Sequence, residues 1–219
     1  MRQWWIIPGR DGGQLELREV EHPTPDPSQV VVAVRGAGIN RGELIGRPLM
    51  KLANPKARPR PSGIEFAGVI TSIGGDVSTW SIGDRVMGRG TACHAEFVAV
   101  DVGALMPIPA GLSFDRAAAI PNVFVTAHDA LVTAAAASSN ESILITAGSS
   151  GVGTAAIQIA SHLRARHIVA TTRTPAKTRE LRDLGASLVV DTTQPQWADR
   201  VRDATGGIDV VIDQVGGSL

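Results

Sequence analysis

The sequence lacks tyrosine altogether and contains a single cysteine, Cys93. One cysteine excludes an intramolecular disulfide framework and favours a reducing compartment, so we expect a cytoplasmic protein. The absence of tyrosine removes the phenol group as a source of catalytic protons. Cys93 and His94 are adjacent in the sequence, but they cannot hold a metal ion without further ligands, and no C-x-x-C cluster supplies them.

The chain also lacks excess charge and long apolar segments. Its 21 Lys and Arg residues balance its 21 Asp and Glu residues, so the net charge favours neither nucleic acid nor an anionic membrane as a partner. The apolar start of the chain is too short for a signal peptide, and the alanine-rich residues 130–137 are too few to span a bilayer. A length of 219 residues is enough for one large domain or two modest ones.

The most informative segment covers residues 142–160, SILITAGSSGVGTAAIQIA. An apolar run, a glycine-rich turn and a helical pattern in this order direct backbone N–H groups and the positive end of a helix at one point, which suits a phosphate. The spacing departs from the usual G-x-G-x-x-G because Ser150 holds the middle position, so an ordinary βα turn is the alternative. The residues expected to bind a dinucleotide here are Gly148, Ser149, Ser150, Gly151, Val152 and Gly153.

Strand and helix patterns alternate after this turn. Strand-like residues 167–171, 188–190 and 208–212 are separated by helical patterns at 177–184 and 197–204. This alternation predicts βαβ units and a parallel sheet. With the strand before the glycines the count reaches four, whereas a complete doubly wound domain has about six. We therefore expect an incomplete domain, which could belong to a fragment, to a truncated gene product or to a chain completed by a partner.

The end of the second strand of this series bears on which dinucleotide is bound. An acidic residue there binds the ribose hydroxyl of NAD, whereas basic residues accept the extra phosphate of NADP. Residues 171–177, TTRTPAK, contain no acid. Thr172, Arg173 and Lys177 are therefore expected to favour NADP(H), because a guanidinium binds a phosphate in a bidentate manner. The alternative is that both cations are ordinary solvated surface charges.

Residues 1–120 are dominated by glycine, proline and short β-type runs. Strand-like runs at 30–34, 66–73, 85–87 and 97–100 indicate a small, loop-rich β domain that is partly barrel-like. We expect Trp4, Trp5, Phe66 and Phe97 in its core or in a groove. The basic residues 56–60 are expected to form a solvated loop, with contact to a phosphate or nucleic acid as the alternative.

Short segments spread along the whole chain give a further signal. They read GINRGE at 38–43, GIEFAGVI at 63–70, GDRV at 83–86, AEF at 95–97, a helical pattern at 121–131 and DVVIDQVGG at 209–217. Together they resemble motifs of the medium-chain dehydrogenase/reductase superfamily, within it the zinc-free quinone oxidoreductases related to zeta-crystallin. The resemblance implies an α/β protein with an N-terminal GroES-like β domain, residues 1–120, followed by an incomplete Rossmann domain, residues 121–219. It also implies an active site in the cleft between the domains, and a homodimer for the complete protein.

The same resemblance bears on the chemistry. Zinc-dependent members of the superfamily use a cysteine, a histidine next to a glutamate and a second cysteine, and this chain has Asn40 and Ile64 at the first two of these positions. Reduction of a quinone or an α,β-unsaturated carbonyl compound needs no metal, because the hydride acceptor contains its own electron sink. The implied function is therefore zinc-independent, NADPH-dependent reduction of such a small molecule. The alternative is a truncated nucleotide-binding remnant without turnover.

The resemblance assigns roles to a few side chains. Asn40 would lie beside the nicotinamide and hold a substrate carbonyl with its amide N–H₂, or else be a turn residue bonded to local backbone. Thr126 would hydrogen-bond the nicotinamide carboxamide, or else cap or decorate a helix. Glu65 is expected to be structural, and the proton would come from solvent or a ribose hydroxyl. The residues expected to border the nicotinamide ribose are Asp213, Val215 and Gly216.

Overall fold

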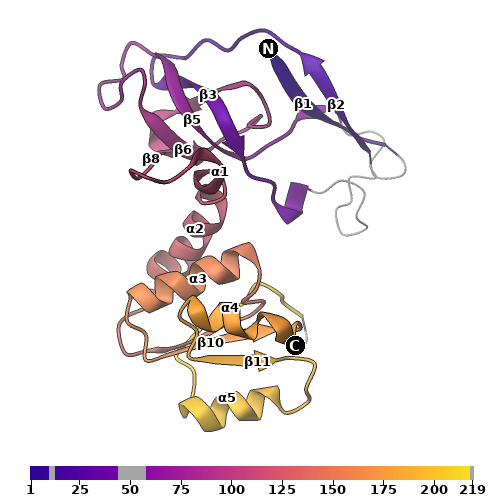
Figure 1. Ribbon diagram of the computed structural model, residues 1–219, viewed down its shortest axis with the longest axis vertical. Coiled ribbons are helices and arrows are strands. Elements are labelled where there is room, and N and C mark those ends of the chain that lie inside the picture. The colour runs from indigo at the N-terminus through magenta and orange to yellow at the C-terminus, as the bar shows by residue number, and fades with distance from the viewer. Residues whose placement is uncertain (10–12, 44–57, 218–219) are drawn as a thin grey trace. The chain divides into compact units, whose positions relative to one another are not determined.

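The computed structural model describes residues 1–9, 13–43 and 58–217 and divides the chain into two compact units, Met1–Asn122 and Val123–Leu219. Figure 1 shows their elements in chain order. The predicted sequence of architectures, an antiparallel β unit followed by a parallel α/β unit, is confirmed. Within the predicted basic loop, Lys56 and Ala57 lie outside the described residues, and Arg58 and Arg60 are exposed.

The first unit contains two sheets. The five-stranded sheet has the order β7-β3-β5-β6-β8, and its strands are Phe97–Asp101, Gln29–Ala37, Glu65–Ile73, Arg85–Arg89 and Leu105–Pro107. The three-stranded sheet has the order β2-β1-β4, with strands Gln14–Glu19, Arg2–Ile7 and Arg60–Pro61. All pairings in both sheets are antiparallel. The four predicted strand patterns lie in β3, β5, β6 and β7, whereas β1, β2, β4 and β8 are additions to the prediction.

The larger of two hydrophobic clusters in the first unit lies on one face of the five-stranded sheet. Val30, Val32, Phe66 and Ile70 are buried there, as alternate residues of a strand must be when one face is covered. The other face is covered by α1, Phe114–Ala117, whose Ala117 packs with residues of β5 and β6. Two short helical turns, η1 (Arg41–Glu43) and η2 (Val102–Ala104), connect strands. The end of β3 pairs with the start of β5, so the segment after β3 lies beside Glu65.

The second unit is built on a four-stranded parallel sheet with the order β11-β10-β9-β12. Its strands are Leu188–Asp191, His167–Thr172, Ser142–Ile145 and Val210–Ile212. The helices are α2 (Pro121–His128), in which the boundary between the units falls, then α3 (Gly151–His162), α4 (Thr178–Asp183) and α5 (Trp197–Thr205). A π-helical turn, η3 (Asp129–Ala134), follows α2, and η4 (Pro175–Lys177) precedes α4. The predicted strands and helices of this unit are all present.

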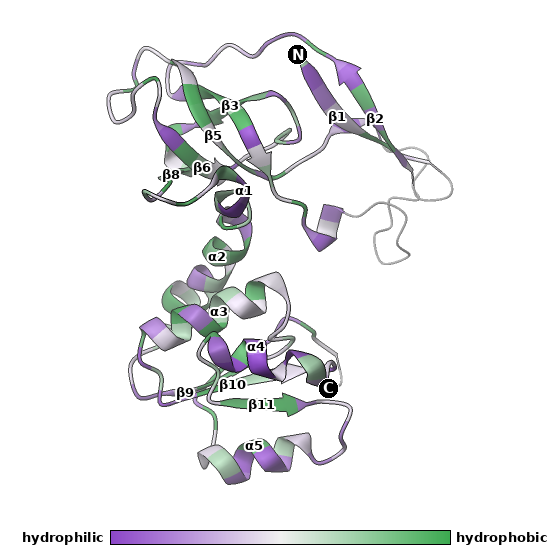
Figure 2. Cartoon of the chain, viewed as in Figure 1, coloured by the Kyte–Doolittle hydropathy of each residue, from purple (hydrophilic) through white to green (hydrophobic). Residues whose placement is uncertain are grey.

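Helices cover both faces of the parallel sheet. Ile143 and Ile145 pack with Ile157 of α3 and Leu181 of α4, while Leu144, which points the other way, packs in the cluster around Val201 of α5. Figure 1 shows α3 and α4 on one side of the strands and α5 on the other. The strand β11 is apolar in Figure 2 except at its end, Asp191, whereas α4 and α5 mix both kinds of residue. This is the pattern of a strand buried on both faces between amphipathic helices.

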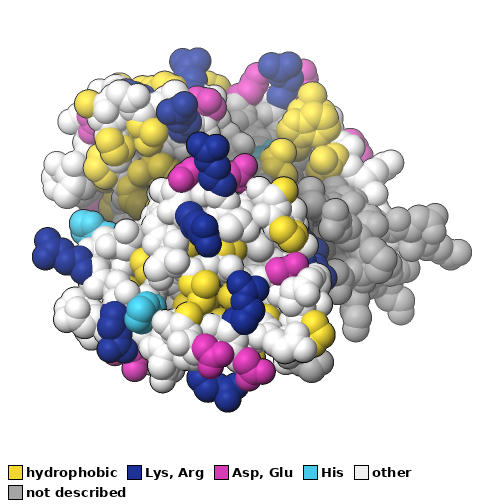
Figure 3. Space-filling model, turned by 60° about the horizontal axis from the view of Figure 1, so that its bottom comes forward, with side chains coloured by type: hydrophobic (Ala, Val, Ile, Leu, Met, Phe, Trp, Pro, Cys, Tyr) yellow, Lys and Arg dark blue, Asp and Glu magenta, His cyan; other side chains and the backbone are white. Residues whose placement is uncertain are grey.

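On the face seen in Figure 3, basic and acidic side chains are interspersed. Among the described residues no helix has both the length and the hydropathy that a membrane crossing requires.

Candidate functional site

The glycine-rich turn between β9 and α3 has the predicted form. Gly148 donates its N–H to the carbonyl oxygen of Thr171 at 2.7 Å, and Ala147 donates to the hydroxyl of Thr171 at 3.1 Å. A side chain on Gly153 would place its Cβ 2.5 Å from the carbonyl oxygen of Ala147, so the close contact of α3 with the turn depends on this glycine. Ala147 has φ of 46°, a left-handed conformation that costs energy for a residue with a side chain.

Ser150, which replaces the usual middle glycine, is the N-cap of α3. Its Oγ accepts the N–H of Gly153 at 3.0 Å and donates to Oε1 of Gln214 at 2.9 Å. The two N–H groups that precede Gly153 in the helix, those of Gly151 and Val152, have no acceptor among the hydrogen bonds of the described residues. Unpaired N–H groups at the positive end of a twelve-residue helix have the geometry that suits an anion.

The end of β10 lies next to this turn. The hydroxyl groups of Ser149 and Thr172 approach to 3.5 Å, and Thr172 Oγ1 accepts the N–H of Thr174 at 3.0 Å. Arg173 and Lys177 follow and are exposed. Neither cation forms an ion pair with any residue in the described part of the chain. The end of β10 therefore places a pair of hydroxyls at the turn, and two cations without an ion-pair partner in the described residues follow it in the chain.

The loop after β12 folds back on the same turn. Asp213 Oδ1 accepts the hydroxyl of Thr146 at 2.8 Å and the N–H groups of Val215 and Gly216 at 3.0 and 3.2 Å. These hydrogen bonds, with that of Val215 the largest contribution, hold the pKa of Asp213 below its usual value. The Asp213 side chain thus organises its own loop, and Gln214 fastens the loop to Thr146 and Ser150.

A second polar centre lies in the first unit, around Asn40. Its Nδ2 donates to Glu65 Oε1 at 2.7 Å and to Glu43 Oε2 at 3.2 Å, and its Oδ1 accepts from Asn122 Nδ2 at 2.8 Å. Both amide protons of Asn40 are therefore directed at carboxylates rather than into open space. Glu65, only 2% exposed, also accepts the backbone N–H of Asn122 through Oε2 at 2.8 Å. Gly38 permits this arrangement, because a Cβ there would lie 2.2 Å from Glu65 Oε1.

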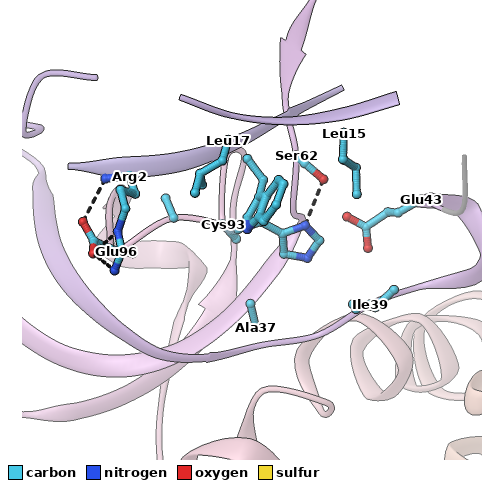
Figure 4. Close-up of a pocket in the computed structure, with 12 residues that line it drawn as sticks. Arg2, Leu15, Leu17, Ala37, Ile39, Glu43, Ser62, Cys93 and Glu96 are labelled. Atoms are coloured by element: carbon cyan, nitrogen blue, oxygen red, sulfur yellow. Dashed lines mark hydrogen bonds and ion pairs between the residues drawn. The ribbon is translucent and has the colours of Figure 1, made fainter. Parts of the chain in front are cut away.

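A cavity of about 850 Å³ lies beside this centre in the same unit. Its walls are mainly apolar and include Trp4, Leu15, Leu17 and Ile39, with the carboxylate of Glu43 at one end and the Arg2–Glu96 ion pair at the other (Figure 4). Of the aromatic residues expected in the core or in a groove, Trp4 lines this cavity and Phe66 lies in the core.

His94 and Cys93 also line this cavity, and both ring nitrogens of His94 have protein partners. The ring nitrogens of His94 pair with Ser62 Oγ at 2.9 Å and with the carbonyl oxygen of Gly38 at 3.0 Å. No group of three or more His, Cys, Asp or Glu side chains in the described residues could hold a metal ion.

Cys93 gives a direct test of the packing around this centre. Burial raises the pKa of its thiol to about 12, and the negative charges of Glu43 and Glu65 act in the same direction. Since the thiolate is the reactive form, we expect alkylation by iodoacetamide at pH 8 to be at least about 100-fold slower in the native protein than after unfolding. Mass spectrometry measures this at the only cysteine of the chain. Equal rates in the two states would contradict the buried placement.

Hydrogen bonds join the predicted glycine turn, residues 148–153, to Thr172 and to the loop that contains Asp213, Val215 and Gly216. Arg173 and Lys177 follow Thr172 in the chain. Asn40 belongs to the first unit, and Thr126 is an exposed residue of α2 in the second. Sequence reasoning missed Gln214 and Asn122, whose contacts join segments far apart in the chain. Glu43 could have been found from the sequence, because it is an acidic residue only three positions after Asn40.

Two families of protein sequences match the chain. Residues 26–126 match the alcohol dehydrogenase GroES-like domain, and residues 151–219 match the zinc-binding dehydrogenase family. The spectinabilin polyketide synthase system protein NorB of Streptomyces orinoci is 36% identical over 99% of this chain, but the match covers only 10% of NorB. The chain thus spans about one tenth of the length of this curated relative.

Solved structures agree with these matches. An alcohol dehydrogenase superfamily protein from Novosphingobium aromaticivorans is 32% identical, with a TM-score of 0.85 over 99% of this chain and 67% of its own. The CurK enoyl reductase is 29% identical, with a TM-score of 0.86 over 99% of this chain and 68% of its own. The chain has an antiparallel GroES-like unit and a parallel Rossmann-like unit with a glycine turn, and its sequence and structural relatives agree with this arrangement. The chain therefore belongs to the alcohol dehydrogenase, or medium-chain dehydrogenase/reductase, superfamily.

Proposed function

We propose that the protein is an NADPH-dependent reductase that transfers hydride to a quinone or an α,β-unsaturated carbonyl compound without zinc. The observation that carries the cofactor assignment is the anion-binding cluster of the second unit. The N–H groups of Gly151 and Val152 suit a pyrophosphate, and the exposed cations Arg173 and Lys177 suit an additional phosphate. A mycobacterial structural relative, 26% identical with a TM-score of 0.84, was solved with NADPH, which supports this assignment.

The substrate class is supported by the relatives and by the donor set of the first unit. The structural relatives include an enoyl reductase and quinone oxidoreductases. Asn40 stands where a zinc ligand is expected by resemblance, its amide is bonded to two carboxylates, and both ring nitrogens of His94 have protein partners. This set offers no vacant imidazole or thiolate to a zinc ion, so we propose that the hydride acceptor relies on its own electron sink.

The chain's own residues would bind the dinucleotide and orient it relative to the substrate. The glycine turn with Ser149 and Ser150, the cluster of Thr172, Arg173 and Lys177, and the loop of Asp213, Val215 and Gly216 would hold the dinucleotide, whose nicotinamide supplies the hydride. Asn40 and Thr126 would contribute hydrogen bonds at the reacting end. Such a site accelerates the reaction mainly by positioning its reactants, with little acid–base help from side chains.

An oxidation screen tests this function. The full-length protein is mixed with NADPH and a panel of quinones, 2-alkenals and enoyl thioesters, with absorbance at 340 nm as the readout and a parallel set treated with a metal chelator. We expect turnover with at least one class and unchanged rates in the chelated set. Loss of activity that zinc restores would overturn the metal assignment. NADPH binding without turnover of any compound would favour the nucleotide-binding remnant instead.

A further inference from the structure

We infer that Glu65 is a positioning residue, which fixes the side-chain orientation of Asn40 and joins it to the first turn of α2. The inference rests on the proposed function, in which Asn40 belongs to the reacting end of the site. Glu65 is the first residue of β5, and Asn40 follows the end of β3, so the antiparallel pairing of these strands brings the two together.

The orientation of the Asn40 amide is set by its surroundings. Glu65 Oε1 and Glu43 Oε2 lie 2.7 and 3.2 Å from Nδ2, and both are acceptors when ionised. Reversing the amide would place its carbonyl oxygen against two carboxylates and its N–H₂ against the N–H₂ of Asn122, which now donates to Oδ1 at 2.8 Å. Only one orientation of the Asn40 amide satisfies all of these groups. In that orientation Asn40 can still accept a hydrogen bond, through the second lone pair of Oδ1, but has no amide proton left to donate.

The second oxygen of Glu65 reaches α2. Oε2 accepts the backbone N–H of Asn122 at 2.8 Å, and Asn122 is the second residue of that helix. A carboxylate at this position satisfies an N–H group that no helical carbonyl can reach and stabilises the positive end of the helix. Glu65 therefore makes two charge-assisted hydrogen bonds, one through each oxygen, in a site almost without solvent.

The role has a consequence for Asn40. The carbonyl-holding role implied by resemblance needs a free amide proton, and in this structure the two protons are engaged by Glu65 and Glu43. In the inferred arrangement Asn40 accepts a hydrogen bond from a hydroxyl or N–H group of its ligand. Glu65 and Glu43 hold the Asn40 amide in the orientation that leaves its oxygen available to the ligand.

The substitution Glu65→Gln tests the inference, because a carboxamide has only one acceptor oxygen. Whichever way the new carboxamide turns, its N–H₂ faces either Asn40 Nδ2 or the N–H of Asn122. We expect kcat to fall by about tenfold or more, since a hydrogen bond to a charged group is lost and a donor is left unpaired. The KM for NADPH is expected to change less than about twofold, because the proposed phosphate contacts lie in the other unit. The matched control is Glu19→Gln, which makes the same change on an exposed strand residue and is expected to leave both constants unchanged.

A readout independent of activity separates this inference from the proposed function. Hydrogen exchange followed by NMR reports the protection of the Asn122 backbone N–H and the Asn40 side-chain amide. We expect Glu65→Gln to reduce both and Glu43→Gln to preserve that of Asn122, because the hydrogen bond to this N–H comes from Glu65.

A second variant covers the case in which Glu65→Gln folds poorly. Asn122→Ala removes the side-chain bond to Asn40 Oδ1 and keeps the backbone N–H that Glu65 accepts, so it should lower kcat by about three- to tenfold. A Glu65→Gln protein with control-level kcat and full protection at both amides would overturn the inference. Wild-type protein inactive on every compound would count against the proposed function alone.

Discussion

Replacing both Arg173 and Lys177 by alanine is expected to raise the Kd for NADPH by about 30- to 100-fold and to leave the Kd for NADH nearly unchanged. Each cation would make a charge-assisted contact with the additional phosphate, and such contacts contribute about 1.5 kcal/mol or more. Two of them correspond to roughly two factors of ten in affinity. Because both cations are exposed, salt should weaken the NADPH preference of the unaltered protein.

Intrinsic tryptophan fluorescence or calorimetry measures the four dissociation constants. The control is Arg179→Ala, which removes one positive charge from α4 at a residue that pairs with Asp183 on the surface. We expect this control to alter neither affinity by more than about twofold. Equal binding of NADPH and NADH by the unaltered protein would remove the basis for assigning Arg173 and Lys177 to the cofactor.

The substitution Gly153→Ala is expected to destabilise the second unit and to weaken nucleotide binding by more than about tenfold. A Cβ at this position would lie 2.5 Å from the carbonyl oxygen of Ala147 and 2.7 Å from Cα of Gly148, both backbone atoms that cannot turn aside. Overpacking of this kind costs about 1–3 kcal/mol and would displace the N–H groups at the start of α3. Helix propensity alone predicts the opposite sign, a gain of about 1 kcal/mol when alanine replaces glycine in a helix.

The sign of the change in unfolding free energy therefore decides between the two effects, and urea denaturation measures it. Gly103→Ala is the control, because open space surrounds its Cβ position, and we expect a change within about 0.5 kcal/mol. A Gly153→Ala protein more stable than the unaltered one would show that α3 does not pack against the turn in the way described.

The second unit was predictable because its signals are local. Each strand is an apolar run, each helix is bounded by a recognisable turn, and Gly185 follows α4 with φ of 119°, a conformation typical of the residue after a helix. The departure from the glycine fingerprint at Ser150 also has a local reason, since a serine at this position caps the helix that follows.

The first unit was less predictable because part of it has no such pattern. Strand β2 reads QLELRE, and all of its residues but one are exposed. Its register is set by pairing with β1, a contact that periodicity cannot reveal because neither face of β2 is buried in a core. The cavity lined by Trp4, Leu15 and Leu17 was not predicted either, because it depends on the same pairing of β1 with β2.

The sequence by itself determined the order of a β unit and a parallel α/β unit, the glycine-rich turn between strand and helix, and the acid-free end of β10, because each depends on residues within about one turn or strand of each other. Tertiary structure alone decided what surrounds Asn40. Glu43 is only three residues from Asn40, but the other two partners, Glu65 and Asn122, are 25 and 82 residues away. Hydrogen bonds to these two distant groups follow from strand pairing and helix placement rather than from any local pattern.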